Sequence, residues 1–524
     1  MQERLKKPTF ADALGVAATY SVCVYGAFLS AVLPLLFRNN YIDINTYKYL
    51  AFTTATYVAF AAFISLLAVR FPVAHFRPPN DKIAFRIRVI GWAMLAFLLI
   101  NAVACFLSEN PELSFAGLPG RRTGLNFLIC AFMMYIMFRF AKGAAPFVLN
   151  GLVLSGALTS LLAVINFLGF DPLRMYVNLV QPEHEMFLST IGNRNFFGGF
   201  LSISLAMAGA KFIFGEGKWS FLYLPGAFLG FAALIAGRSD LAFAGVGAGM
   251  IALLFMSLKD ARAFSRFLAL AATAAAAALS LKLLYNVYSG QSLFIYPSFA
   301  KSLLTWRGAE FALSACGFAA LACAFFVRKY AGVRPLALIR RVSAIAIAAL
   351  TALALGLLLY FTISGKTPPV MPDLLRFDDH FGNFRGYIWI RAARIFGGLP
   401  PLNQLIGLGP DMFARHALLA YRDEMVAVTR APFDNCHNEY LQYLLTSGIL
   451  GLGAYLTAMS ASFHALIRRV RAGEFGAAPP VLAALSAYAA QSFFNVNQPM
   501  TTLFSFLLMA LAFRESRITA QTQS

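Results

Sequence analysis

Long apolar stretches recur from one end of the chain to the other and are separated by mostly short polar segments. Each is about as long as a transmembrane helix, which needs about 20 apolar residues. A transmembrane β-barrel would instead show alternating segments of about 10 residues. The pattern predicts an all-α fold, a polytopic transmembrane bundle of about 12–14 spans. The fourteen candidate segments are 11–37, 48–69, 88–107, 124–140, 146–168, 193–213, 219–236, 241–257, 266–286, 308–327, 342–363, 438–463, 478–494 and 499–513.

Composition supports this interpretation. Of the 524 residues, 59% are hydrophobic and 13% are charged, whereas a soluble domain has about 25% charged residues. The first apolar run is too long for the core of a signal peptide, and we expect it to remain as the first span. Five of the six cysteines lie in apolar runs, and no spacing indicates a disulfide framework or a zinc site.

The formal charge of +20 has a topological explanation. With the N-terminus inside, the inside segments hold 25 basic and seven acidic residues, while the outside segments hold 18 and 16. This asymmetry follows the positive-inside rule and suits anionic membrane lipids, so no nucleic-acid partner is needed. We therefore expect a multi-pass protein of the cytoplasmic (inner) membrane with both termini in the cytoplasm.

The same topology places all the long polar segments outside. The chain is interpreted as one membrane domain, 1–524, in which the segment 364–437 forms a large extracytoplasmic loop. A loop of this length usually carries function. Because ATP is absent on that face, an activated donor there is most naturally a lipid-linked phosphate ester.

Two motifs stand out in this loop region. Gly365-Lys366-Thr367 lacks the first glycine of a phosphate-binding loop, so that interpretation is rejected. The segment 384–396 predicts a helix in which Arg385 and Trp389 share one face, and Arg391 and Arg394 another. Arg385 suits a diphosphate because a guanidinium donates bidentately and stays charged, although an interfacial helix at lipid headgroups is the alternative.

The segment 434–441 lies where the loop re-enters the membrane. Asp434 or Asn435 is expected to cap the next helix, with His437 in its first turn. His437 is a candidate general base because imidazole titrates near neutral pH. The alternative is an ordinary polar residue at a helix end.

Other polar residues mark three further outer turns. Arg238-Ser239-Asp240 places charges between two apolar spans, either as a functional site or as an internally paired turn. The segments 120–124 and 190–197 enter spans from outside and contain glycine, asparagine and arginine, which could equally be helix caps. His184, His380 and His416 fit no metal motif.

Taken together, these motifs resemble the O-antigen ligase / polysaccharide polymerase family of bacterial membrane glycosyltransferases. The resemblance rests on the following stretches: Gly-Arg-Arg-Thr-Gly at 120–124, Ser189 to Phe197, the turn 238–240, Arg385 to Trp389, Gly-Leu-Gly-Pro at 407–410 with Phe413, His437 to Leu441 with Gly448 and Gly451, and Phe494-Asn495. The outer turn departs from the family pattern, which usually reads Ser-Arg.

The resemblance implies a GT-C-like helix bundle that moves a glycan from an undecaprenyl-diphosphate donor to an acceptor hydroxyl on a glycan, lipid or protein, without metal or cofactor. By family analogy Arg238 and Arg385 bind the diphosphate, and His437 acts on the acceptor. The other expected substrate-binding residues are Arg121, Arg122, Asn193, Arg194, Trp389, Arg391, Asn438 and Tyr440.

Four alternatives remain open. A repeat-unit polymerase of the same family would share these motifs with a ligase. A protein-glycosylating or teichoic-acid-type transferase is the second alternative. A flippase or transporter for lipid-linked oligosaccharides would be expected to show charges within spans and internal repeats. A membrane scaffold would leave the long outer loop unexplained.

Overall fold

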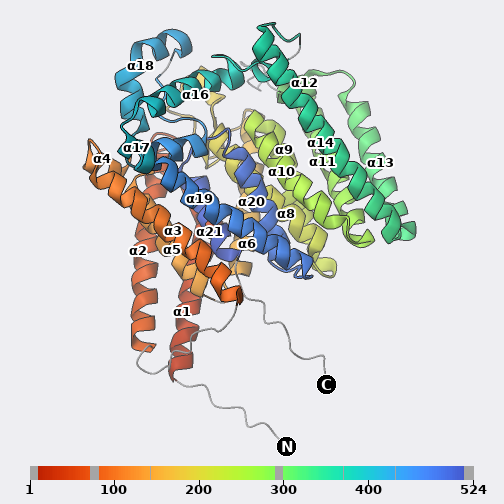
Figure 1. Cartoon of the computed structure of the whole chain (residues 1–524). Helices are drawn as coiled ribbons and strands as arrows, with labels where there is room; N and C mark the ends of the chain where they lie inside the picture. Colours follow the sequence, from red (N-terminus) through yellow and green to blue (C-terminus); the bar gives the residue numbers. More distant parts are fainter. Residues whose placement is uncertain are drawn as a thin grey trace, which may run out of the picture.

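The computed structural model describes residues 10–70, 82–141, 143–288, 299–369, 371–430 and 432–512. The protein is an all-α bundle with a layer of shorter helices at one end (Figure 1). Every one of the fourteen predicted spans coincides with a helical segment. The matching helices are α1 (Phe10–Ala27, continued by η1, Phe28–Val32, and η2, Leu33–Leu35), α2 (Ile44–Arg70), α3 (Lys82–Phe106), α5 (Leu125–Phe140), α6 (Ala145–Phe167), α8 (Arg194–Phe214), η4 (Lys218–Tyr223) with α9 (Leu224–Ala236), α10 (Asp240–Ser257), α11 (Ala261–Tyr288), α13 (Ala309–Tyr330), α14 (Val333–Ser364), α19 (Glu439–Arg471), α20 (Ala478–Gln491) and α21 (Pro499–Leu511).

Within the described residues, eleven helices are long and apolar enough to cross a membrane. The helices α5, α20 and α21 are shorter, with 16, 14 and 13 residues. The prediction of an all-α polytopic bundle is confirmed. The charged termini used to predict sidedness, 1–9 and 513–524, lie outside the described residues, as does most of the basic segment 70–88.

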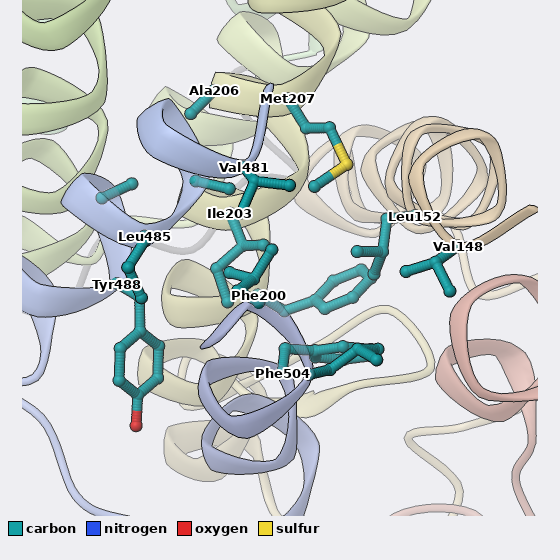
Figure 2. Close-up of a cluster of buried hydrophobic side chains, with 14 of the residues drawn as sticks. Val148, Leu152, Phe200, Ile203, Ala206, Met207, Val481, Leu485, Tyr488 and Phe504 are labelled. Carbon is teal, nitrogen blue, oxygen red and sulfur yellow. The ribbon is translucent and has the colours of Figure 1, made fainter. Parts of the chain in front are cut away.

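The core of the bundle lies around α8. Phe200 and Ile203 of α8 pack among Leu485 of α20 and Phe504 of α21, and Leu152 of α6 lies on the other side (Figure 2). In the most apolar 18-residue stretch of α8, 94% of the residues are buried, whereas in that of α14 none is buried. The helix α14 stands at one edge of the bundle (Figure 1), so its apolar side chains suit direct contact with lipid.

The long loop folds into helices of its own. These are α15 (Pro372–Leu375), α16 (Phe381–Gly398), α17 (Pro401–Ile406) and α18 (Phe413–Thr429). The helices α16, α17 and α18 gather at one end of the bundle beside α4 (Pro111–Ala116) (Figure 1). A small core joins this layer to α19, and it consists of Tyr387, Ile388, Ala392, Phe413, Ala417, Met425, Cys436 and Leu445. The remaining short elements are α7 (Gln181–His184), α12 (Phe299–Thr305) and the antiparallel strands β1 (Phe187–Leu188) and β2 (Gly192–Asn193).

A break in α19 locks the loop layer onto the bundle. Gly448 has φ 67° and ψ −174°, so the helix is interrupted after its first nine residues. Next to the break, the backbone N–H groups of Leu408 and Gly409 donate to the carbonyls of Leu445 and Thr446, at 2.9 and 3.0 Å. The loop therefore uses carbonyls that a continuous helix would have bonded internally.

Glycine at 407 is needed for this approach. Its φ is +88°, and a Cβ there would lie 2.2 Å from the backbone of Thr446. We expect Gly407→Ala to destabilise the protein by about 2–4 kcal/mol, because it adds backbone strain to an overpacked contact. The thermal midpoint of the purified protein checks this. Gly397→Ala, where a Cβ meets nothing within 4 Å, is the control and should leave the midpoint unchanged.

Candidate active site

A group of positively charged side chains, here called the cationic site, lies at the end of the bundle that carries the loop helices α16, α17 and α18. It is built from segments far apart in the sequence. Its central histidine, His437, has a left-handed backbone with φ 50°, and its N–H donates to Asn435 Oδ1 at 3.0 Å. Asn438 caps α19 by accepting the N–H of Leu441 at 3.0 Å. The expectation that Asp434 or Asn435 caps this helix was wrong. His437 precedes the helix because its φ is incompatible with a helical first turn.

Arg385 enters the site from the start of the regular part of α16. Three left-handed residues, 382–384, reverse the chain immediately before it. Its Nε donates to Phe494 O at 2.9 Å, and its Nη1 donates to Gly382 O at 2.5 Å. A Cβ at Gly386 would lie 1.9 Å from Asp378 O. Arg385 is therefore held by backbone carbonyls from two segments, which fixes the direction of its guanidinium.

Arg238 lies in the turn before α10, again with a left-handed φ of 51°. It is buried and its Nη1 lies 3.8 Å from Glu185 Oε1. Its guanidinium also lies over the ring of Phe167, 5.7 Å from the centroid. Its ion-pair partner is thus Glu185 rather than the adjacent Asp240.

Arg121 and Arg194 complete the group of cations. Arg121 makes a bidentate pair with Asp434, with Nε–Oδ2 at 2.9 Å and Nη2–Oδ1 at 2.6 Å. It also lies over the ring of Phe196. Arg194 opens α8, and among the described residues its guanidinium makes no hydrogen bond or ion pair. Its donors therefore remain available for a ligand.

The pKa shifts show that these groups influence one another. Burial lowers the pKa of His437, and the positive charges of Arg385 and Arg121 lower it further, against the opposing effect of Asp434. Burial also lowers the pKa values of Arg238 and Arg385 to about 10. The charge of Arg194 acts in the same direction on both. Arg238 and Arg385 therefore keep their charge near pH 7, while His437 is neutral.

Four helix N-termini meet the same group. Arg194 opens α8, the turn at 238–240 opens α10, Arg385 opens the regular part of α16, and His437 precedes α19. Each helix N-terminus carries the equivalent of about half a positive charge, while several of the first N–H groups bond within the protein, such as Arg194 N to Met186 O and Glu439 N to Ser492 O. The arrangement is suited to a polyanion such as a diphosphate.

The remaining predicted substrate-binding residues make contacts within the protein. Asn193 caps α8 by accepting from Asn195 N, and Asn438 caps α19. Trp389 Nε1 donates to Cys436 O at 3.0 Å, and Tyr440 OH donates to Ala489 O at 2.8 Å. Asn193, Trp389 and Asn438 thus fix backbone next to Arg194 and His437, whereas Tyr440 joins α19 to α20.

The last two predicted residues lie beside the cationic group rather than in it. Arg391 pairs with Asp379 and Glu424, and its guanidinium stacks on Tyr387, 3.8 Å from the ring centroid. Arg122 has a left-handed backbone, and no described residue bonds its buried Nε.

Sequence reasoning missed two positioning residues. Asp411 is buried and accepts from Leu118 N and Thr123 N at 2.7 and 3.3 Å, so it fastens the turn that carries Arg121 to the loop layer. Asn195 accepts from Ser239 Oγ at 2.9 Å through its side chain and from Asn495 Nδ2 at 3.0 Å through its carbonyl. The sequence features that could have pointed to them are the position of Asp411 after Gly-Leu-Gly-Pro and the position of Asn195 within the segment 190–197. Neither feature reveals the distant partner of its residue.

The described residues contain no group of three or more His, Cys, Asp or Glu side chains that could hold a metal ion.

The chain is similar to a known family over the region that contains part of the cationic site. Residues 302–456 match the family model described as O-antigen ligase. The resemblance to the O-antigen ligase family is thereby confirmed. No curated protein matches the chain.

The matched region of this O-antigen ligase-like protein runs from α12 through the loop layer into α19, and it contains Arg385 and His437. The apolar helices make the chain a multi-pass membrane protein, and the match links its region 302–456 to polysaccharide biosynthesis. Arg121, Arg194 and Arg238 lie outside the match, so their place in the site rests on the geometry above.

Proposed function

We propose that this protein is a glycosyltransferase that moves a glycan from undecaprenyl diphosphate to an acceptor hydroxyl on the outer face of the inner membrane. The single observation that carries the proposal is the convergence of Arg385, Arg238 and Arg194 with the neutral His437 at one group of helix N-termini. A diphosphate needs several fixed cations, and an incoming hydroxyl needs a neutral base.

In the proposed reaction, Arg385, Arg194 and Arg238 bind the diphosphate of the donor. The bond between C1 of the sugar and the phosphate oxygen breaks, and these cations stabilise the charge that develops on the leaving oxygen. The acceptor oxygen attacks C1 from the opposite side, which inverts the configuration. The proton of the acceptor hydroxyl goes to the His437 imidazole, and undecaprenyl diphosphate leaves.

Product analysis in the host tests this proposal and separates its two forms. If the protein is a ligase transferring to a lipid A-core or similar acceptor, the Arg385→Ala strain accumulates full-length chains on undecaprenyl diphosphate. If it is a polymerase, that strain accumulates single lipid-linked repeats. Unchanged surface glycan at matched expression would contradict the proposed site.

The pH dependence follows from the lowered pKa of His437. Because burial and two cations depress that pKa, the free enzyme keeps a neutral imidazole well below pH 6.5. We expect kcat/KM for the donor to stay flat as the pH falls from 7 to about 5. A bound diphosphate offsets the positive charge of Arg385 beside His437, so the acidic limb of kcat should lie at higher pH. Matching acidic limbs near 6.5 in both profiles would contradict this assignment.

The proposed chemistry needs no bound metal, because Arg385, Arg194 and Arg238 supply the positive charge. We therefore expect transfer by the purified protein to stay within about twofold of its original rate after incubation with a chelator. An enzyme that relied on a metal for charge stabilisation would instead lose about 10²–10³ in rate. A loss that added magnesium or manganese restores would contradict this part of the proposal.

A further inference from the structure

A second basic site lies far from the proposed active site. It is a cavity of about 530 Å³, within the range of about 300–1,000 Å³ that is usual for ligand pockets. It opens between the end of α8, the short helix η4 and the helices α11 and α13. Its lining residues include four basic side chains and two aromatic rings, namely Lys218, Arg262, Arg266, Arg328, Phe212 and Phe221.

The cavity lies at the opposite membrane boundary from the active site. The helix α8 begins with Arg194 at the active site and ends with Phe214, and it has 21 residues. At 1.5 Å per residue this is roughly 30 Å, the thickness of the hydrocarbon core. Charge asymmetry in the sequence assigns this boundary to the cytoplasmic side.

The positive charges of the cavity are not neutralised within the described part of the chain. None of its four basic residues forms an ion pair there, and no acidic side chain lines the cavity. The nearby acidic residues in sequence are Glu216, which is exposed, and Asp260, which accepts from Ala263 N at 3.0 Å.

Arg266 is held in a fixed position at the wall of the cavity. Its Nη1 donates to the carbonyls of Phe212, Ile213 and Gly215, at 3.1, 3.3 and 2.6 Å. The guanidinium also lies over the rings of Phe212 and Phe221. One nitrogen thus caps the C-terminus of α8, and no described residue bonds Nε or Nη2. Such an arginine is preorganised to donate to a phosphate.

The rim of the cavity has the character of a membrane interface. In η4, Trp219 is 69% exposed and Leu222 67% exposed, and Lys218 Nζ lies over the Trp219 ring. Aromatic residues and lysine in this combination are typical of the headgroup region. A ligand of this cavity therefore reaches it from the lipid layer.

We propose that this cavity binds the headgroup of an anionic phospholipid, such as phosphatidylglycerol, from the leaflet opposite to the active site. The phosphodiester accepts from Arg266, Arg262 and Arg328, and the acyl chains follow the exposed apolar surface of α13. Basic pockets between transmembrane helices at this boundary suit such headgroups. The inference is independent of the transfer reaction, because it concerns only the binding of a lipid.

The test is lipid retention by the full-length protein, taken from vesicles of phosphatidylcholine and phosphatidylglycerol and measured by native mass spectrometry. Wild type is expected to retain phosphatidylglycerol selectively. Arg262→Gln/Arg328→Gln should reduce the retained phosphatidylglycerol about tenfold or more, since it removes two basic groups beside the phosphate. Both side chains are exposed, so the variant should fold normally.

Arg468→Gln/Arg471→Gln is the matched control, because it removes two exposed charges at the end of α19 without lining the cavity. It should retain as much phosphatidylglycerol as wild type. Equal losses in the two double variants would mean unspecific attraction and overturn the proposal. Retention that excess inorganic phosphate abolishes would identify a free-phosphate site and overturn it as well.

Discussion

Replacing Arg385 with alanine is expected to lower glycan transfer by about 10²–10³-fold, the usual cost of one fixed electrostatic donor at a developing charge. The effect should appear both in kcat and in KM for the donor, because in the proposed reaction Arg385 binds the diphosphate before and during bond breaking. Arg385→Lys should recover only a small part of the rate, since an ammonium lacks the planar fork that Phe494 and Gly382 hold in place. The measurement is transfer by purified protein with a lipid-linked donor.

Arg394→Ala is the control for this experiment. Arg394 lies on the same helix, is exposed, and has no ion-pair partner among the described residues. The Arg394→Ala substitution removes the same positive charge without changing the proposed site, so this variant should keep wild-type kinetics. Equal activity of the Arg385 and Arg394 variants would remove Arg385 from the mechanism.

The second large effect is expected at His437. His437→Ala should lower kcat by about 10²–10⁴-fold, the range that a general base contributes. Because His437 acts on the acceptor in the proposed reaction, KM for the donor should stay close to wild type, in contrast to the Arg385 variant. Transfer kinetics at varied donor concentration measure both constants.

His380 offers the comparison, since it belongs to the same loop and its side chain is 68% exposed. His380→Ala should leave kcat unchanged. A His437 variant with normal kcat and raised KM for the acceptor would make His437 a binding residue, and the proton would need another acceptor.

The sequence predicted the membrane helices well, because each depends on its own run of apolar residues. It predicted less about the loop, whose helices α17 and α18 are held by contacts with distant segments. Two of the pairs that build the site, Arg121 with Asp434 and Arg385 with Phe494, join residues 313 and 109 positions apart. No local pattern encodes such pairs.

The prediction of the helix cap before α19 failed for a related reason. Asp434, Asn435 and Asn438 are all good capping residues, and the choice among them depends on tertiary contacts. Asp434 pairs with Arg121, and Asn435 donates to Asn497 Oδ1 at 2.7 Å. Asn438 therefore remains as the cap, and His437 is left outside the helix.

The bond between Arg385 and the carbonyl of Phe494 has a consequence for biosynthesis. Arg194 and Arg238 leave the ribosome early, but the guanidinium of Arg385 is oriented only after the turn around residue 494 has been made. A nascent or truncated chain can therefore occupy the membrane without a complete site. Such a chain lacks the oriented Arg385 of the proposed reaction and should leave the lipid-linked donor unused.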